Sequence, residues 1–139
     1  MVRRDVVAAR VTRAAAWLDD AERRFSLPVD EFARDVPGRD LALFYLFLAI
    51  QECIDLAAHW VADAGWMAPD DAGSTFDVLA DHAAIERETA DRLRAATGLR
   101  NRIAHGYALL DYPRVHGESR RGIPALREFL DKAALAAGL

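Results

Sequence analysis

The stretch Leu41-Ala-Leu-Phe-Tyr-Leu-Phe-Leu-Ala-Ile50 decides the fold of this chain, because its ten residues are apolar on every side of a helix. A helix that is apolar all round is buried among other elements, and ten residues are too few to span a bilayer. We therefore expect a central helix that has Asp40 as its N-cap and continues to about Ala64. Gly65 and Pro69 then end it.

Helical spacing of apolar residues continues on both sides of this run, and no convincing strand is found. Before the central helix, we expect a first helix over 4–25 and one short turn over 30–35, closed by Pro37-Gly38. After it, we expect a short helix that a capping box of Ser74 and Asp77 opens and that runs to about 82, and then a helix from 85 through 99 that can extend to 110. A break at 111–113 precedes a last helix over 115–137, which is interrupted near 122–124. Four main helices with short connections predict an all-α antiparallel four-helix bundle with additional short helices.

Composition limits the class of protein. The 139 residues are 53% hydrophobic and 29% charged, which predicts one folded domain over 1–139. The single cysteine, Cys53, lies in an apolar run and is expected in the core. No apolar segment of signal-peptide type follows Met1, so we expect a cytoplasmic protein without a membrane span. The net charge of −4 argues against a general nucleic-acid coat protein.

The segment Arg100-Asn-Arg-Ile-Ala-His-Gly-Tyr107 carries the functional chemistry. Arginine offers a permanent charge and a forked donor set for phosphate oxygens, and histidine suits proton transfer near neutrality. On a regular helix Arg100 and His105 lie about 140° apart, whereas Asn101 and His105 share a face. Convergence on one phosphate therefore needs a helix that ends or bends here, or an arginine that reaches around it. The alternative is a helix end that carries basic residues against its dipole.

The other histidines and the lone cysteine have no short metal-ligand spacing, so we expect neither a metal site nor a cofactor. A polar stripe follows the apolar half of the central helix, at Glu52, Asp55, His59 and Asp63. We expect Glu52, His59 and Asp63 on a solvated face. Asp55 has two alternatives: the same solvated face, or a charge-assisted hydrogen bond to Arg100 or His105.

Residues 99–107 resemble the Arg-x4-His motif of the HEPN-domain ribonucleases. The tyrosine two residues after the histidine resembles the HepT toxin branch of that superfamily. The helix segment at 51–57, the segment at 76–79 and the tail at 111–129 are also similar to HepT, so the resemblance covers about 40–129.

The resemblance implies a HEPN-type bundle that cleaves RNA without a metal. Arg100 would bind the scissile phosphate and His105 would act as general acid or base, while Asn101, Arg102 and Asp55 would support the substrate or the histidine. The 2′-hydroxyl would attack the adjacent phosphate of an RNA, with tRNA among the candidates. The family's behaviour also implies a homodimer in which two motifs face one cleft.

The resemblance gives Tyr107 a role of its own, as the target of adenylylation by a partner nucleotidyltransferase of the MNT type. An added AMP would place bulk and negative charge beside the phosphate site. The expected function is thus the toxin component of a HepT/MNT-type toxin-antitoxin system. The alternative is a non-catalytic HEPN module that binds a nucleotide or the partner, and a purely structural helical adaptor ranks last.

Overall fold

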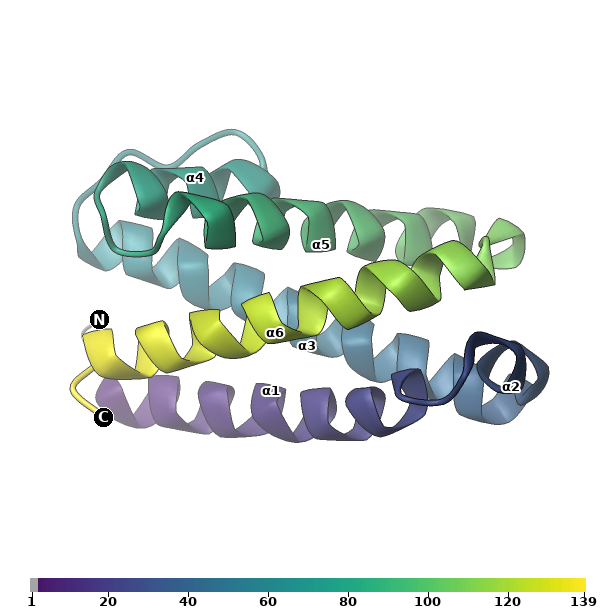
Figure 1. Ribbon diagram of the computed structural model, residues 1–139. Coiled ribbons are helices and arrows are strands. Elements are labelled where there is room, and N and C mark those ends of the chain that lie inside the picture. The colour runs from purple at the N-terminus through teal and green to yellow at the C-terminus, as the bar shows by residue number, and fades with distance from the viewer. Residues whose placement is uncertain (1–2) are drawn as a thin grey trace.

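The computed structural model describes residues 3–139, and every regular element in that part of the chain is helical. The elements are α1 (Arg4–Phe25), α2 (Val29–Arg34), α3 (Val36–Asp63), α4 (Ala72–Asp81), α5 (Arg87–Gly106), the 3₁₀ turn η1 (Tyr107–Leu109) and α6 (Tyr112–Ala136). Figure 1 shows the long helices α1, α3, α5 and α6 as a bundle, with α2 at one end and α4 beside α5 at the other. The expected all-α four-helix bundle with additional short helices is confirmed.

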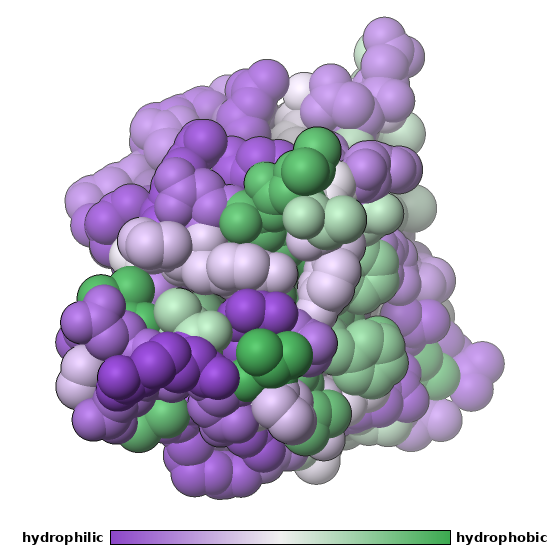
Figure 2. Space-filling model, turned by 90° about the vertical axis from the view of Figure 1, so that its right-hand side faces the viewer, coloured by the Kyte–Doolittle hydropathy of each residue, from purple (hydrophilic) through white to green (hydrophobic). Residues whose placement is uncertain are grey.

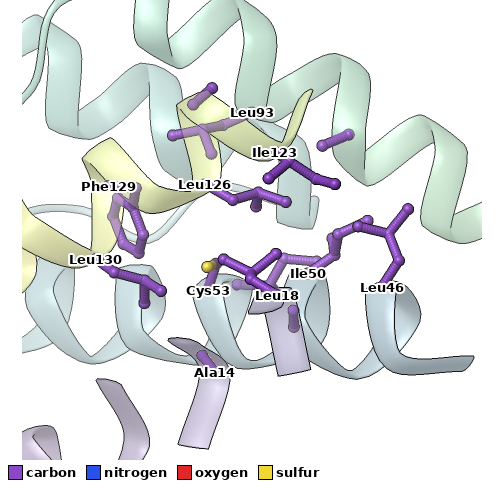
Figure 3. Packing of buried hydrophobic residues seen from close by; sticks show 14 of the residues in the cluster. Ala14, Leu18, Leu46, Ile50, Cys53, Leu93, Ile123, Leu126, Phe129 and Leu130 are labelled. Atoms are coloured by element: carbon purple, nitrogen blue, oxygen red, sulfur yellow. The ribbon is translucent and has the colours of Figure 1, made fainter. Parts of the chain in front are cut away.

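The core of the bundle is built around α3, which contacts every other helix. Figure 3 shows Leu18 of α1, Ile50 and Cys53 of α3, Leu93 of α5 and Phe129 of α6 directed toward the same interior. Cys53 is fully buried, as expected, and burial raises the pKa of its thiol well above the usual range.

By length and composition, α3 is apolar enough to cross a membrane, but 56% of its most apolar stretch is buried inside the bundle. A central core helix shows the same combination of length and apolar composition. We therefore describe α3 as the core helix of the bundle.

Three helix starts differ from the expectation, and in each case an aspartate upstream is the cap. Asp35, not Asp40, caps α3 by accepting a hydrogen bond from Gly38 N at 3.3 Å. Asp71, not Ser74, caps α4, and Asp111 caps α6. Pro37 therefore lies in the first turn of α3 instead of closing the preceding turn. Proline is well suited to that position, because the first helical N–H groups have no intrahelical acceptor.

The last helix begins earlier than expected and is not interrupted. Pro113 lies in its first turn, so the expected break at 111–113 is a helix start. Pro124 lies inside α6 and is exposed to solvent. Water can bind the carbonyl that a proline leaves without its helical donor, which explains why the helix continues through this position.

Glu52 does not lie on a solvated face, so that expectation was wrong. It is 7% exposed and accepts hydrogen bonds from Arg10 Nη1 at 3.1 Å and Arg13 Nη2 at 3.0 Å. A buried carboxylate needs such partners, and here both come from α1. His59 and Asp63 of the same stripe are exposed, as expected.

Candidate functional site

The motif segment forms the end of α5. This helix runs without interruption from Arg87 through Gly98 to Gly106, and the chain then tightens into the turn η1. The helix therefore ends one residue after His105. Asp111 follows closely and caps α6, so the motif lies where α5 passes into α6 (Figure 1).

Arg100 is held against α3 by neutral acceptors. Its Nη1 donates to Oε1 of Gln51 at 2.6 Å, and its Nη2 donates to Oδ1 of Asn101 at 2.6 Å. Its Nε is buried and has no hydrogen-bond partner among the described residues. Two amides orient this guanidinium without neutralising it, so its positive charge stays available to an anion.

Asp55 is linked to Arg100 only indirectly, through the side chain of Gln51. Its carboxylate accepts a hydrogen bond from Nε2 of Gln51 at 3.1 Å and lies 3.8 Å from Nη1 of Arg10. Of the two alternatives for Asp55, the direct bond to Arg100 or His105 is not formed. Asp55 instead fixes the amide of Gln51, which turns the oxygen of that amide toward Arg100. Sequence reasoning missed Gln51 as a site residue, although its place one turn before Asp55 is a usable signal.

His105 is exposed on the other side of α5. It lines a cavity of about 480 Å³ together with Asn101, Arg102, Asp111 and Arg114 of the α5–α6 junction, whereas Arg100 is not among the residues that line this cavity. The structure thus brings His105, Asn101 and Arg102 together and leaves Arg100 on the α3 side. This agrees with the separation expected from helix geometry.

Arg102 is the more neutralised of the two motif arginines. It forms an ion pair with Glu118 of α6, and Glu118 also accepts a hydrogen bond from Nε of Arg114 at 2.6 Å. Arg102 therefore ties α5 to α6 beside His105, while Arg100 keeps its full charge.

Tyr107 is the first residue of η1, and 38% of its surface is exposed. The carboxylate of Asp40 lies close to its hydroxyl. Partial burial, and after it the nearby Asp40 carboxylate, raises the pKa of Tyr107 to about 12. Asp40, the expected helix cap, thus faces the hydroxyl of Tyr107.

The partners of Asp40 hold it in place beside Tyr107. Arg39 Nε donates to Asp40 at 3.2 Å, and the guanidinium of Arg39 lies over the ring of Tyr112 at 3.9 Å from its centroid. This contact joins the start of α3 to the start of α6. Tyr107 therefore lies in a fixed polar cluster and is still reachable from solvent.

Apolar side chains reach the surface near the motif. Figure 2 looks at the end of the bundle that carries α2 and the start of α3, and it shows green side chains between polar ones. Leu41 is 41% exposed and Phe44 55% exposed, while Leu109 in η1 is 91% exposed. The sequence suggested that the apolar run of α3 is buried on every side, but the structure shows that it is not. One face of it is open to solvent.

Within residues 3–139 no group of three or more histidine, cysteine, aspartate or glutamate side chains is placed to hold a metal ion. The polar groups at the end of α5 are instead arginine, asparagine, histidine and tyrosine. These supply positive charge, hydrogen-bond donors and one proton carrier.

The sequence model of the family described as "Ribonuclease HepT-like" matches residues 15–133. The chain is also 31% identical, over 98 residues, to an inferred RNase of Archaeoglobus fulgidus, and the match covers 70% of this chain and 74% of the relative.

Solved structures share the fold at lower identity. A HEPN toxin of Shewanella oneidensis, tri-AMPylated and in complex with its MNT antitoxin, has a TM-score of 0.83 at 21% identity, covering 92% of this chain and 96% of that one. A toxin-antitoxin structure with AMP-PNP has a TM-score of 0.82 at 20% identity and covers 93% of this chain and 98% of that chain. YutE of Bacillus subtilis, a cytosolic protein of unknown function, has a TM-score of 0.76 at 15% identity and covers 93% and 89%. On its sequence match and its bundle together, this chain belongs to the HepT-like ribonuclease family.

Proposed function

We propose that this protein is a metal-independent endoribonuclease and the toxin component of a HepT/MNT-type toxin-antitoxin system. The observation that carries the proposal is Arg100, whose guanidinium is held by the amides of Gln51 and Asn101 and has no carboxylate partner within residues 3–139. Such an arginine is oriented and fully charged, as the binding of a scissile phosphate requires. His105, exposed at the end of the same helix, supplies the proton carrier.

The reaction is an attack of the RNA 2′-hydroxyl on the adjacent phosphate. A neutral His105 accepts the hydroxyl proton while the oxygen–phosphorus bond forms. A protonated histidine then gives a proton to the 5′-oxygen as its bond to phosphorus breaks, which leaves a 2′,3′-cyclic phosphate. Arg100 stabilises the charge that develops on the phosphorane-like transition state. Asn101 and Arg102 line the cavity that holds His105 and support the substrate there.

A homodimer completes this site in the proposal. One chain holds Arg100 on the α3 side of α5 and His105 on the α6 side, and it offers a single motif histidine. Pairing two chains supplies the second proton carrier and can bring an arginine and a histidine to one cleft. The exposed apolar residues Leu41 and Phe44 of α3 support pairing, because a monomer leaves them in water.

The proposed antitoxin is an MNT-type nucleotidyltransferase that adenylylates Tyr107. The support is the related S. oneidensis toxin, which is AMPylated and bound to an MNT antitoxin. The phenolic oxygen attacks the α-phosphorus of ATP and pyrophosphate leaves, while the phenolic proton passes to the nearby carboxylate of Asp40. The bound AMP then repels RNA phosphates from the end of α5.

Growth after induced expression tests the proposal. The wild-type chain is expected to stop growth in the absence of the antitoxin, whereas Arg100→Ala and His105→Ala are expected to be harmless at equal protein levels. If the wild type is harmless, or if both variants match its toxicity, the toxin proposal fails. Nucleotide binding without RNA cleavage, unaffected by His105→Ala, would favour the non-catalytic binding module instead. We also propose that 1–139 acts as one domain in the cytoplasm.

A further inference from the structure

A groove between α5 and α6 lies beside the proposed cleavage site and shares Arg102 with it. Its volume is about 650 Å³, within the range of sites that bind small molecules. Apolar and small residues from α3, α5 and α6 form its floor: Leu46, Ile50, Ala96, Leu99, Gly122 and Leu126. A groove of this kind suits a flat, partly apolar group better than a fully hydrated one.

The rim of the groove is strongly basic. Four arginines (92, 102, 114 and 121) and Glu118 line it, so four positive charges and one negative charge leave a net +3. Glu118 forms ion pairs with both Arg102 and Arg114. Arg121 has no ion pair with any residue in 3–139, although the chain as a whole is acidic. The surroundings of the groove therefore favour an anionic ligand.

Two glycines keep the groove open. A Cβ atom at Gly98 of α5 would meet no atom within 4 Å, and one at Gly122 of α6 would meet only the Cβ of Ala96 at 4.0 Å. Neither glycine has a positive φ, so the backbone does not require glycine at these positions. Glycine weakens a helix interior, and the chain nevertheless leaves this space empty on both helices.

The groove adjoins the His105 cavity. Arg102 and Arg114 line both spaces, and the ion pairs of Glu118 lie at the boundary between them. A ligand that extends along α5 from His105 therefore reaches the apolar floor next.

We propose that this groove binds one nucleotide of the RNA next to the scissile phosphate. The base lies on the floor between Gly98 and Gly122, and its phosphate binds the arginine rim at Arg121. The inference rests on the proposed ribonuclease function and adds a subsite to it. A base has an apolar face and a phosphate has oxygens that match a guanidinium, so one nucleotide fits both parts of the groove. An acidic segment of a protein partner would bind only the arginines of the rim and would leave the apolar floor without a contact.

A pair of adjacent arginines tests the rim. The probe is a fluorescein-labelled single-stranded RNA with 2′-O-methyl groups throughout, which cannot be cut by 2′-hydroxyl attack, and the readout is fluorescence anisotropy. Arg121→Gln and Arg120→Gln change the net charge equally, but Arg120 does not line the groove. We expect Arg121→Gln to raise Kd about tenfold and to reduce the salt slope by about 0.7, as for one lost phosphate contact, and Arg120→Gln to do neither.

A pair of substitutions at one glycine tests the floor without a change of charge. Gly98→Ala and Gly98→Leu both place a good helix former in α5, and the open space at this position accepts either Cβ. Only leucine fills the groove. We expect Gly98→Leu to raise Kd for the same probe about tenfold or more and Gly98→Ala to leave it near the wild-type value. Circular dichroism is expected to show equal helix content in both variants.

The outcomes separate this proposal from the proposed function. The groove proposal is overturned if either matched pair behaves alike toward the probe. It is also overturned if Arg121→Gln and Gly98→Leu weaken the binding of the partner nucleotidyltransferase but leave RNA binding unchanged. If both pairs split as expected and the wild type does not cut unmodified RNA, the groove stands and the ribonuclease proposal falls. If the wild type cuts RNA but the two variants of each pair bind the probe equally, the ribonuclease proposal stands and the groove proposal falls.

Discussion

At the scale of single residues, Tyr107 is the proposed target of adenylylation. Its hydroxyl lies near the carboxylate of Asp40, and its side chain is partly exposed. After co-expression with an MNT-type nucleotidyltransferase, we expect mass spectrometry to find AMP-sized adducts on the peptide that holds Tyr107 and none after Tyr107→Phe. An adduct on another residue, or no adduct at all, would contradict the assigned target.

The partial burial of Tyr107 and the nearby carboxylate of Asp40 predict a pH dependence. Burial and Asp40 raise the pKa of Tyr107 to about 12 in the folded chain, above its ordinary value. The folded state therefore holds the phenolic proton more tightly, so this stabilisation is complete below the unfolded pKa and is lost as pH rises through the folded pKa. We expect Asp40→Asn to lower the pKa of Tyr107. A titration of ¹³C-labelled tyrosine by NMR, assigned with Tyr107→Phe, measures it, and an unchanged pKa would show that Asp40 has no influence.

At the scale of helices, Glu52 joins α1 to α3. It is buried and bonded to Arg10 and Arg13. Since these arginines are 27% and 50% exposed, solvent weakens the pairs. We expect Glu52→Ala to lower the free energy of unfolding by about 2 kcal/mol in urea denaturation. His59→Ala, on the exposed part of the same stripe, is the control, with an expected change within about 0.5 kcal/mol. Equal effects would mean that the Glu52 pairs do not stabilise the bundle.

The helical class of the chain and its four long helices were predictable, because apolar spacing reports which face of each helix is buried. The residues at which helices begin were harder to predict. Three aspartates compete with nearby residues as caps, and Pro37 and Pro113 suit a first turn as well as a break. The burial of Glu52 was missed because its partners lie 39 and 42 residues away, which no local pattern encodes.

In the candidate site, too, features that depend on spacing along one helix were predictable, and features that depend on packing between helices were not. Helix periodicity predicted that Arg100 and His105 lie on different faces, since that depends on spacing alone. The role of Gln51 depends on the packing of α3 against α5 and could not be predicted in the same way.

At the scale of the whole molecule, the exposed apolar face of α3 predicts a dimer. We expect native mass spectrometry to give twice the 15.4 kDa of one chain. Phe44→Arg is expected to shift the population to monomer, because it places a charge on the paired face. His59→Arg adds the same charge to an exposed position further along the helix and is the control. A wild type that remains monomeric at working concentration would contradict pairing.

Cleavage of RNA by the purified chain in the presence of EDTA tests the central proposal most directly. We expect the wild type to cut RNA and leave 2′,3′-cyclic phosphate ends. Arg100→Ala and His105→Ala are each expected to reduce the rate by about a hundredfold or more, because one removes the phosphate clamp and the other the proton carrier. Absence of cleavage by the wild type, or cleavage by either variant at the wild-type rate, would contradict the assignment of Arg100 and His105 as the cutting pair.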